Sequence, residues 1–167
     1  ISREKAIRVL ESFFNVNSEA GNGPRYLKER FVRDNQGRKW SIVRDGSVHT
    51  MDGSVDEYGN PAKGGNELVT PPLKYEDIDM LQELIRKLRR AGAKVDESCG
   101  IHIHVGLQPY TAKSLKNLIK FYGKYENMFY KSVQVLPNRE DGYTRKLAVR
   151  HPSLVNEIGK AKTMEDI

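Results

Sequence analysis

The chain is organised around one short stretch, Ser98-Cys99-Gly100-Ile101-His102-Ile103-His104-Val105-Gly106. Apolar and polar residues alternate strictly from residue 101 to residue 105, which predicts a short β-strand. Alternation places His102 and His104 on one face of this strand and the apolar residues on the other. We therefore expect the apolar face to pack on a core while the two imidazoles point together into a cleft.

Paired histidines of this kind can bind a ligand. Two neutral imidazoles on one strand face can hold a metal ion or hydrogen-bond a phosphate, and Gly100 and Gly106 let the backbone turn or approach a bound group. The alternative is two histidines on a solvated sheet face. Cys99 beside them is either part of a Cys–His nucleophile or a small packing residue.

The composition is that of a soluble globular domain. The chain has 167 residues, 38% hydrophobic and 30% charged, which is enough to bury a core. The net charge of +6 suits an anionic ligand such as a nucleotide or nucleic acid, or serves solubility alone. The single cysteine excludes an internal disulfide, and no membrane span or signal peptide is visible, so a cytoplasmic location is expected.

The expected elements alternate between hairpins and helices. Three segments carry an apolar stripe at helical spacing and are expected to be helices: residues 2–14, 75–91 and 111–133. Three segments are expected to be strands: residues 26–33, 38–44 and 66–70. The first two strands form a hairpin through the turn at 34–37, with Phe31 and Trp40 as core anchors, and the second ends at Asp45.

This mixture favours an α+β domain in which helices pack on one face of an antiparallel β-sheet. The other face of the sheet would then be open to a ligand. We expect a single domain over residues 1–167 with a tail over residues 138–167. This tail is expected to be basic and irregular from Asn138 to Pro152, with two short helical pieces after it.

Three residues on or beside the expected strands could bind a ligand. Glu67 alternates with Asn66 and Leu68, so it is expected on the open face, with Leu68 in the core. A carboxylate there suits magnesium or manganese, although alone it is more often a solvated strand residue. Asp45 and Ser47 follow the strand at 38–44, where ordinary turn chemistry also explains them.

Arginines mark the tail segment. Guanidinium groups of Arg139, Arg145 and Arg150 could bind carboxylates or phosphates in a fork geometry. A solvated basic surface is the alternative, which we favour for Arg139 and Arg150. The sequence contains no Walker-type phosphate loop, paired-cysteine zinc site or serine-nucleophile motif.

Three segments in this order resemble the amidoligase family, which belongs to the carboxylate–amine ligase superfamily together with glutamine synthetase and glutamate–cysteine ligase. They are Trp40-Ser41-Ile42-Val43-Arg44-Asp45-Gly46-Ser47, Gly65-Asn66-Glu67-Leu68-Val69-Thr70-Pro71-Pro72-Leu73 and Cys99-Gly100-Ile101-His102-Ile103-His104-Val105-Gly106. The resemblance covers residues 1 to 145 or so, and the three segments in order are more specific than any one alone.

The resemblance implies a glutamine-synthetase-like sheet and ATP-dependent amide formation through an acyl phosphate, with Mg²⁺ or Mn²⁺ as cofactor. The expected partners are small-molecule or peptide carboxylates and amines and a second copy of the chain, with neither membrane nor nucleic acid. It implies roles for six residues: metal binding for Glu67 and His102, ATP binding for His104 and Ser47, and catalysis for Asp45 and Arg145.

The chain also departs from the family pattern. The family begins with a strand carrying a Glu-x-Glu pair and has a later Glu-x-Arg strand, and these residues contain neither in the corresponding place. We therefore expect residues 1–167 alone to be inactive as a ligase and to expose an unpaired sheet edge.

Two other functions stay open. A zinc hydrolase could use the two histidines with Glu67 as third ligand, although His49 and His151 have no recognisable spacing. A basic nucleic-acid-binding module would interleave aromatic and exposed basic residues, whereas Tyr122 and Tyr125 lie on the apolar side of an expected helix. Metal preference and salt-dependent nucleic-acid binding discriminate these functions from the ligase.

Overall fold

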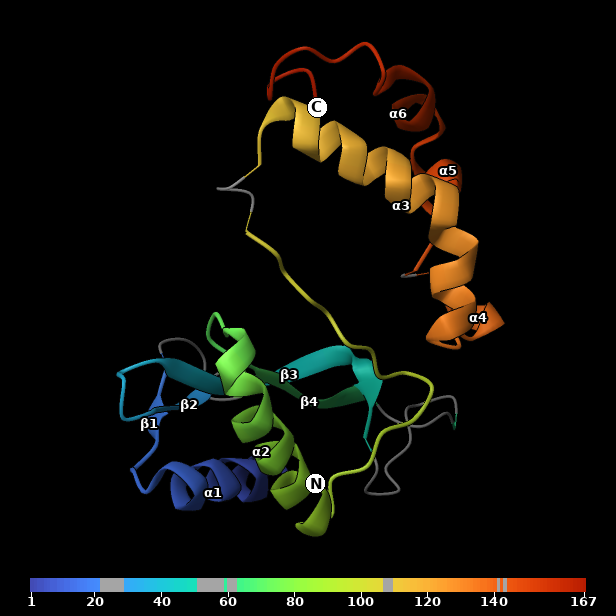
Figure 1. The fold of residues 1–167 in the computed structure, drawn as a ribbon. Helices are drawn as coiled ribbons and strands as arrows, with labels where there is room; N and C mark the ends of the chain where they lie inside the picture. Colours follow the sequence, from blue (N-terminus) through green and yellow to red (C-terminus); the bar gives the residue numbers. More distant parts are fainter. Residues whose placement is uncertain (22–28, 51–58, 60–62, 107–109, 141, 143) are drawn as a thin grey trace. The chain divides into compact units, whose positions relative to one another are not determined.

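The structure is a computed structural model that describes residues 1–21, 29–50, 59, 63–106, 110–140, 142 and 144–167 (Figure 1). The chain falls into two compact units, Ile1–Ile101 and His102–Ile167. The single domain expected over residues 1–167 stays a prediction.

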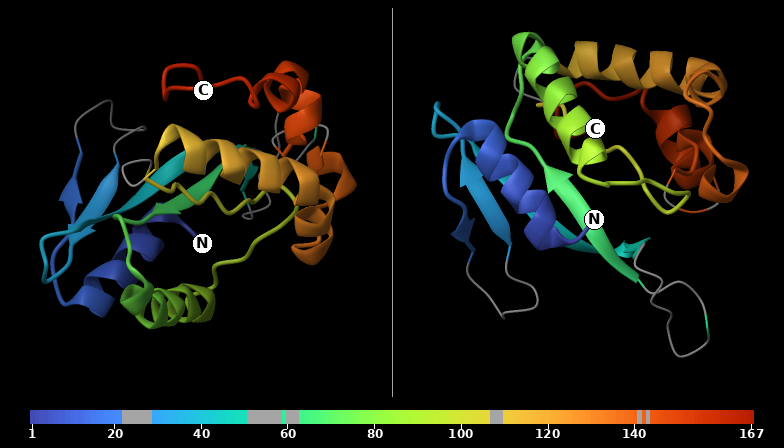
Figure 2. Two further views of the ribbon diagram at one scale, coloured as in Figure 1. Left: turned by 45° about the horizontal axis from the view of Figure 1, so that its top comes forward. Right: turned by 90° about the horizontal axis from the view of Figure 1, so that it is seen from below.

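The first unit is built on an antiparallel four-stranded sheet with the order β1-β2-β3-β4. Its strands are β1 (Glu19–Ala20), β2 (Arg30–Arg33), β3 (Lys39–His49) and β4 (Lys63–Val69). Helices α1 (Arg3–Phe14) and α2 (Ile78–Arg90) lie together on one face of this sheet (Figures 1 and 2). The expected α+β arrangement is confirmed in this unit.

The core lies between the two helices and the sheet. Ser2 caps α1, as its side chain accepts a hydrogen bond from the Lys5 backbone N–H at 3.2 Å. The buried cluster contains Ala6, Ile7, Leu10, Val32, Trp40, Ile42, Leu84 and Leu88. These apolar side chains come from α1, β2, β3 and α2, so their burial joins the helices to the sheet.

The expected hairpin of β2 and β3 is confirmed over the described residues, and residues 26–28 of its first expected strand lie outside them. Val32 pairs with Trp40, and the turn closes where the Gly37 N–H donates to the Asp34 carbonyl at 2.8 Å. Trp40 is fully buried in the core. Phe31 is buried too, but it pairs with Ser41 and so lies on the opposite face of the sheet from Trp40.

Two expectations about the first unit are wrong in part. The strand β3 does not end at Asp45 but continues to His49. The stripe expected to face the core in α2 contains Ile78, Leu81, Ile85 and Leu88. Leu88 is buried, but the fully buried position is Leu84, and Ile78 and Ile85 are 39% and 41% exposed. Because successive helical residues are rotated by about 100°, these two isoleucines lie about 100° or more around the helix from Leu84, at the rim of its contact.

The second unit consists of helices. They are α3 (Ala112–Ser132), α4 (Pro137–Glu140), α5 (Leu147–Arg150) and α6 (Pro152–Glu157). Thr111 caps α3, which confirms the expected long helix, and α5 and α6 pack against each other and against α3. The segment 138–152, expected to be irregular, contains α5 and most of α4, and α6 lies where short helical pieces were expected to follow. The apolar side of α3 is only partly covered, since Leu118 and Tyr122 are 45% and 38% exposed.

A buried carboxylate organises the hairpin turn. The side chain of Asp34 is 2% exposed and accepts hydrogen bonds from Trp40 Nε1 at 3.0 Å and Arg38 Nε at 2.8 Å. Arg38 also donates through Nη1 to Asp77 at 2.8 Å, at the start of α2. Burial by itself raises the pKa of Asp34, but hydrogen bonds from Trp40 and Arg38 outweigh it and hold that pKa below its usual value.

We predict that Asp34→Ala destabilises the first unit by about 3–5 kcal/mol, because it leaves the Trp40 indole N–H and the Arg38 guanidinium without their buried partner. Urea unfolding followed by the fluorescence of Trp40, the single tryptophan of the chain, measures this. The control is Asp79→Ala at an exposed position in the first turn of α2, expected to cost less than about 1 kcal/mol. Equal losses in the two variants would contradict the role of Asp34.

The same carboxylate predicts a pH dependence. Because the pKa of Asp34 is lower in the folded than in the unfolded chain, its contribution is present above the unfolded value of about 3.9 and is lost as pH falls through the folded pKa. Other carboxylates share this trend, so the test compares the free energy of unfolding of wild type and Asp34→Asn. It is measured by urea unfolding at pH values from about 6 to about 3. The variant should show the shallower loss of stability on acidification; parallel curves would refute the assignment.

Candidate functional site

The face of the sheet that α1 and α2 leave uncovered carries two carboxylates. Val43 pairs with Glu67 and Asp45 pairs with Gly65, so Glu67 and Asp45 lie on the same face as diagonal neighbours. Residues in this relation usually lie about 7–8 Å apart, within reach of one bound ion or phosphate. Leu68 packs against the core on the other side. The expected placement of Glu67 on the open face and Leu68 on the core face is confirmed.

Asp45 and Ser47 form a local turn inside β3. The Ser47 N–H and Oγ both donate to Asp45 Oδ1 at 2.7 Å. The strand is irregular here, since Asp45 pairs with Gly65 and His49 with Lys63, which leaves more residues on β3 than on β4 between the two pairs. The ordinary turn chemistry that the sequence left open is present, and a role of these two residues in binding or catalysis stays a prediction.

Two glycines of β4 let β3 come close at this irregularity. A Cβ at Gly65 would lie 2.5 Å from Val48 Cγ1 and 2.9 Å from the His49 carbonyl oxygen. Gly64 has a φ of +117° and lies against the guanidinium of Arg44. The backbone next to Asp45 is therefore held by contacts that a larger residue would disturb.

The far end of β3 is joined to the segment that leads to the histidines. Ser98 is buried, and its Oγ accepts a hydrogen bond from the His49 backbone N–H at 2.9 Å and donates to Asp96 Oδ1. The Ser98 N–H also donates to Asp96 Oδ1, at 2.9 Å, and His49 Nδ1 lies 3.4 Å from Asp96 Oδ2. The hydrogen bond from Ser98, with His49 adding to it, holds the pKa of Asp96 below its usual value.

This cluster was not found by the sequence reasoning, which considered His49 only for metal spacing. A signal exists in the pattern Asp-x-Ser, which occurs at 45–47, 52–54 and 96–98. The first and the last form the same turn, and 52–54 lies outside the described residues. Cys99, considered above as a nucleophile beside histidine, donates a weak hydrogen bond to Asp96 Oδ1 at 3.8 Å. A Cys–His pair stays untested.

The strand expected at residues 101–105 is wrong. The structure describes this segment without regular secondary structure, and Ile101, Ile103 and Val105 are 90%, 82% and 71% exposed. Alternation predicts which side chains share a face. It does not predict a neighbouring strand, which is needed to hydrogen-bond the backbone N–H and C=O groups of this segment. Within the described residues, no ladder is formed by this segment and its apolar face packs on no core.

The six residues predicted to form the site are divided between the two units. Asp45, Ser47 and Glu67 lie together on β3 and β4. The other three are in the second unit and are exposed: His102, His104 and Arg145. A metal site shared by Glu67 and His102 therefore stays a prediction. Among the residues that the structure describes, no group of three or more His, Cys, Asp or Glu side chains is arranged to hold a metal ion.

Arg145 lies on a connection that α3 holds at both ends. The Tyr130 hydroxyl donates to the carbonyl oxygen of Thr144, and the Leu147 N–H donates to Glu126 Oε1 at 2.7 Å. Glu126 is buried, and burial raises the pKa of Tyr130 to about 12. The backbone that carries Arg145 is thus fixed within the second unit while its side chain is exposed.

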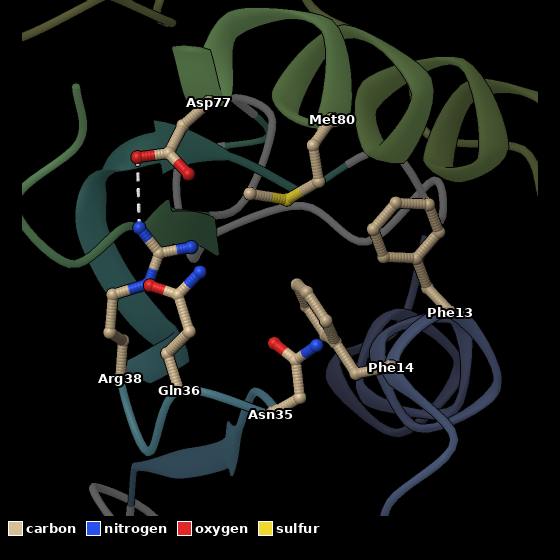
Figure 3. Close-up of a pocket in the computed structure, with 7 residues that line it drawn as sticks. All are labelled: Phe13, Phe14, Asn35, Gln36, Arg38, Asp77 and Met80. Atoms are coloured by element: carbon tan, nitrogen blue, oxygen red, sulfur yellow. Dashed lines mark hydrogen bonds and ion pairs between the residues drawn. The ribbon is translucent and has the colours of Figure 1, made fainter. Parts of the chain in front are cut away.

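A cavity of 440 Å³ lies away from these residues, where α1 and α2 meet the hairpin turn (Figure 3). It is lined by Phe13, Phe14, Asn35, Gln36, Arg38, Asp77 and Met80. The charge of Arg38 is compensated there by Asp34 and Asp77. None of the six predicted site residues lines it, and we assign it no role.

Within the described part of the chain, no helix has the length and apolar character needed to cross a membrane.

We predict that Gly65→Ala destabilises the first unit by about 1–3 kcal/mol, because its Cβ would force Val48 and the His49 carbonyl apart from β4. Gly46→Ala on the adjacent strand is the matched control, since a Cβ there meets nothing within 4 Å, and it should be neutral or stabilise by up to about 1 kcal/mol. Urea unfolding followed by Trp40 fluorescence measures both. If Gly65→Ala behaves like the control, the close approach is not a constraint.

Comparison with known proteins identifies the family. No curated protein and no solved structure matches the chain. The model of the family described as "putative amidoligase enzyme" matches residues 1–167. This confirms the resemblance that the three segments around Asp45, Glu67 and His102 indicated. The chain therefore belongs to the amidoligase family.

Proposed function

We propose that the protein is an ATP-dependent carboxylate–amine ligase that forms an amide bond through an acyl phosphate, with Mg²⁺ or Mn²⁺ as cofactor. The observation that carries the proposal is the family match over the whole of residues 1–167. Neither a zinc hydrolase nor a nucleic-acid-binding module has a comparable observation in its favour.

The open face of the sheet supports this function. Glu67 and Asp45 supply carboxylate oxygens on neighbouring positions of β4 and β3, which are ligands of the kind that Mg²⁺ and Mn²⁺ prefer. Such a cation neutralises the crowded charge of ATP phosphates during phosphoryl transfer. The net charge of +6 also favours the approach of a nucleotide.

The proposed roles follow from the chemistry of each side chain. Glu67 and His102 would hold the metal, and His104 and Ser47 would contact ATP. Arg145 would fix the substrate carboxylate through its forked guanidinium. Asp45 would orient the reacting groups from its place beside Glu67.

The reaction proceeds in two steps. An oxygen of the substrate carboxylate attacks the γ-phosphorus of ATP, and the bond to the bridging oxygen breaks to release ADP. The amine nitrogen then attacks the acyl carbon, phosphate leaves with the bonding electrons, and the nitrogen loses a proton. Small-molecule or peptide carboxylates and amines are the substrate class. The chain contributes by orienting the two reactants and the phosphates in line.

We predict that Glu67→Gln and His102→Ala each lower ATP-dependent amide formation by at least about 100-fold, the scale on which loss of one electrostatic partner of the transition state acts. Both variants should fold normally, because Glu67 lies on the open face and His102 is exposed. The measurement is ADP release by the gene product that contains these residues, with a panel of amino acids and peptides and with Mg²⁺ or Mn²⁺.

Glu83→Gln is the matched control, since it also neutralises a glutamate. Its carboxylate is 41% exposed on α2 and pairs with Arg86 and Arg90 at 3.4 and 3.6 Å, and such exposed pairs contribute little. Turnover should be unchanged in this variant. Wild-type turnover by a protein carrying both Glu67→Gln and His102→Ala would refute the assignment of the metal ligands.

A further inference from the structure

The segment that carries the two histidines lacks the support that a strand would give it. Residues 101–105 have no regular structure, and their apolar side chains are exposed. A chain segment of this kind must be ordered before it can present a ligand, and ordering its backbone opposes binding through lost entropy. Some contact outside the segment is therefore needed to restrict it.

Asp96, Ser98 and His49 supply such a contact, and we name these three residues the Asp96 anchor. The hydrogen bonds form a chain that ends at the carboxylate. The His49 N–H donates to Ser98 Oγ at 2.9 Å, and the Ser98 hydroxyl in turn donates to Asp96. A second link is the 3.4 Å contact of His49 Nδ1 with Asp96 Oδ2. Hydrogen bonds in such a chain polarise and strengthen one another, particularly when an ionised carboxylate accepts the last one.

The anchor continues into the start of the histidine segment. The Cys99 N–H donates to the Asp96 carbonyl oxygen at 3.1 Å, so the turn from Asp96 to Cys99 is closed by backbone as well as by side chains. The partner on β3 is 49 residues away in sequence. An isolated turn has only local hydrogen bonds, whereas this one fixes a loop to the strand that also carries Asp45 and Ser47.

We infer that Asp96 and Ser98 are positioning residues that hold the histidine segment to the end of β3, so that His102 is presented for metal binding. This inference rests on the proposed function. Ser98 precedes His102 by four residues, so the chain between them spans at most about 14 Å even when fully extended. Loss of the anchor would leave the histidines chemically intact but free to sample many more positions.

The experiment compares wild type with Asp96→Ala, Asp96→Asn and Ser98→Ala in three measurements. Mn²⁺ affinity is measured by calorimetry with the metal alone, and ADP release is measured as a function of Mn²⁺ concentration. Hydrogen exchange of the amides in residues 99–106 is compared with that of α1 and β3. The midpoint of thermal unfolding shows whether each variant is folded.

We expect Asp96→Ala and Ser98→Ala to weaken Mn²⁺ binding about 10- to 100-fold, because the freed segment must then be ordered when the metal binds. The Mn²⁺ concentration for half-maximal turnover should rise by the same factor, with turnover at saturating Mn²⁺ largely retained. Exchange in residues 99–106 should accelerate while α1 and β3 stay protected. Asp96→Asn keeps an acceptor oxygen for Ser98 and should fall between Asp96→Ala and wild type.

Asp166→Ala is the matched control. Asp166 Oδ2 likewise accepts two backbone hydrogen bonds, from Lys162 and Thr163 at 2.8 Å each, but it lies near the end of the chain and has no proposed role. This variant should bind Mn²⁺ as wild type does. A loss as large as that of Asp96→Ala would overturn the inference.

The outcomes separate the inference from the proposed function. Unchanged Mn²⁺ affinity and unchanged exchange in folded Asp96→Ala would overturn the anchor while leaving the ligase proposal intact. A wild type that binds Mn²⁺ but releases no ADP with any substrate would refute the ligase proposal. The ratio of the Mn²⁺ affinities of wild type and Asp96→Ala would still show whether the Asp96 anchor supports metal binding. A wild type that binds no Mn²⁺ would overturn the inference, because His102 would then not be a metal ligand. If Asp96→Ala fails to fold, the Mn²⁺ affinity and hydrogen exchange of Ser98→Ala and Asp96→Asn test the inference instead.

Discussion

The in-register pairing of β3 with β4 determines the rest of the first unit. Ile42 pairs with Leu68 on the core face, and Val43 pairs with Glu67 on the open face. Because side chains alternate along a strand, a slip of one residue would turn Glu67 into the core and Leu68 into solvent. Burial of the apolar face therefore also places the carboxylates, and the candidate site depends on the same constraint as the core.

The parts of the fold that the sequence predicted are those set by local signals. Ser2 caps α1, alternation gives the face of Glu67, and the turn chemistry at 34–37 gives the hairpin. The strand expected at 101–105 is wrong because alternation describes one strand, whereas a ladder needs a second one. Pairing is a property of the whole fold, so no pattern within residues 98–106 could have decided it.

The candidate site shows the same division. The sequence placed Glu67 correctly because alternation along a paired strand gives its face, whereas Asp45 was expected at the end of a strand and lies inside β3. It missed Asp96, although Asp-x-Ser was visible, because the contact with His49 is long-range: the hydrogen bond from His49 to Ser98 joins residues 49 positions apart in sequence. Turn motifs predict their own hydrogen bonds, and only the folded chain shows which of them also hold a distant strand.

The two ends of β3 differ in burial and regularity. Trp40 and Ile42 are buried and in contact with the helices, whereas the stretch from Asp45 to His49 is irregular and half-exposed. Residues that bind ligands must keep polar groups accessible, which costs packing, so a site is best placed where the strand has already left the core. The buried Asp34–Trp40 pair holds the hairpin end of β3, and the turns at Asp45 and Asp96 at the other end can arrange polar groups without being needed for the core.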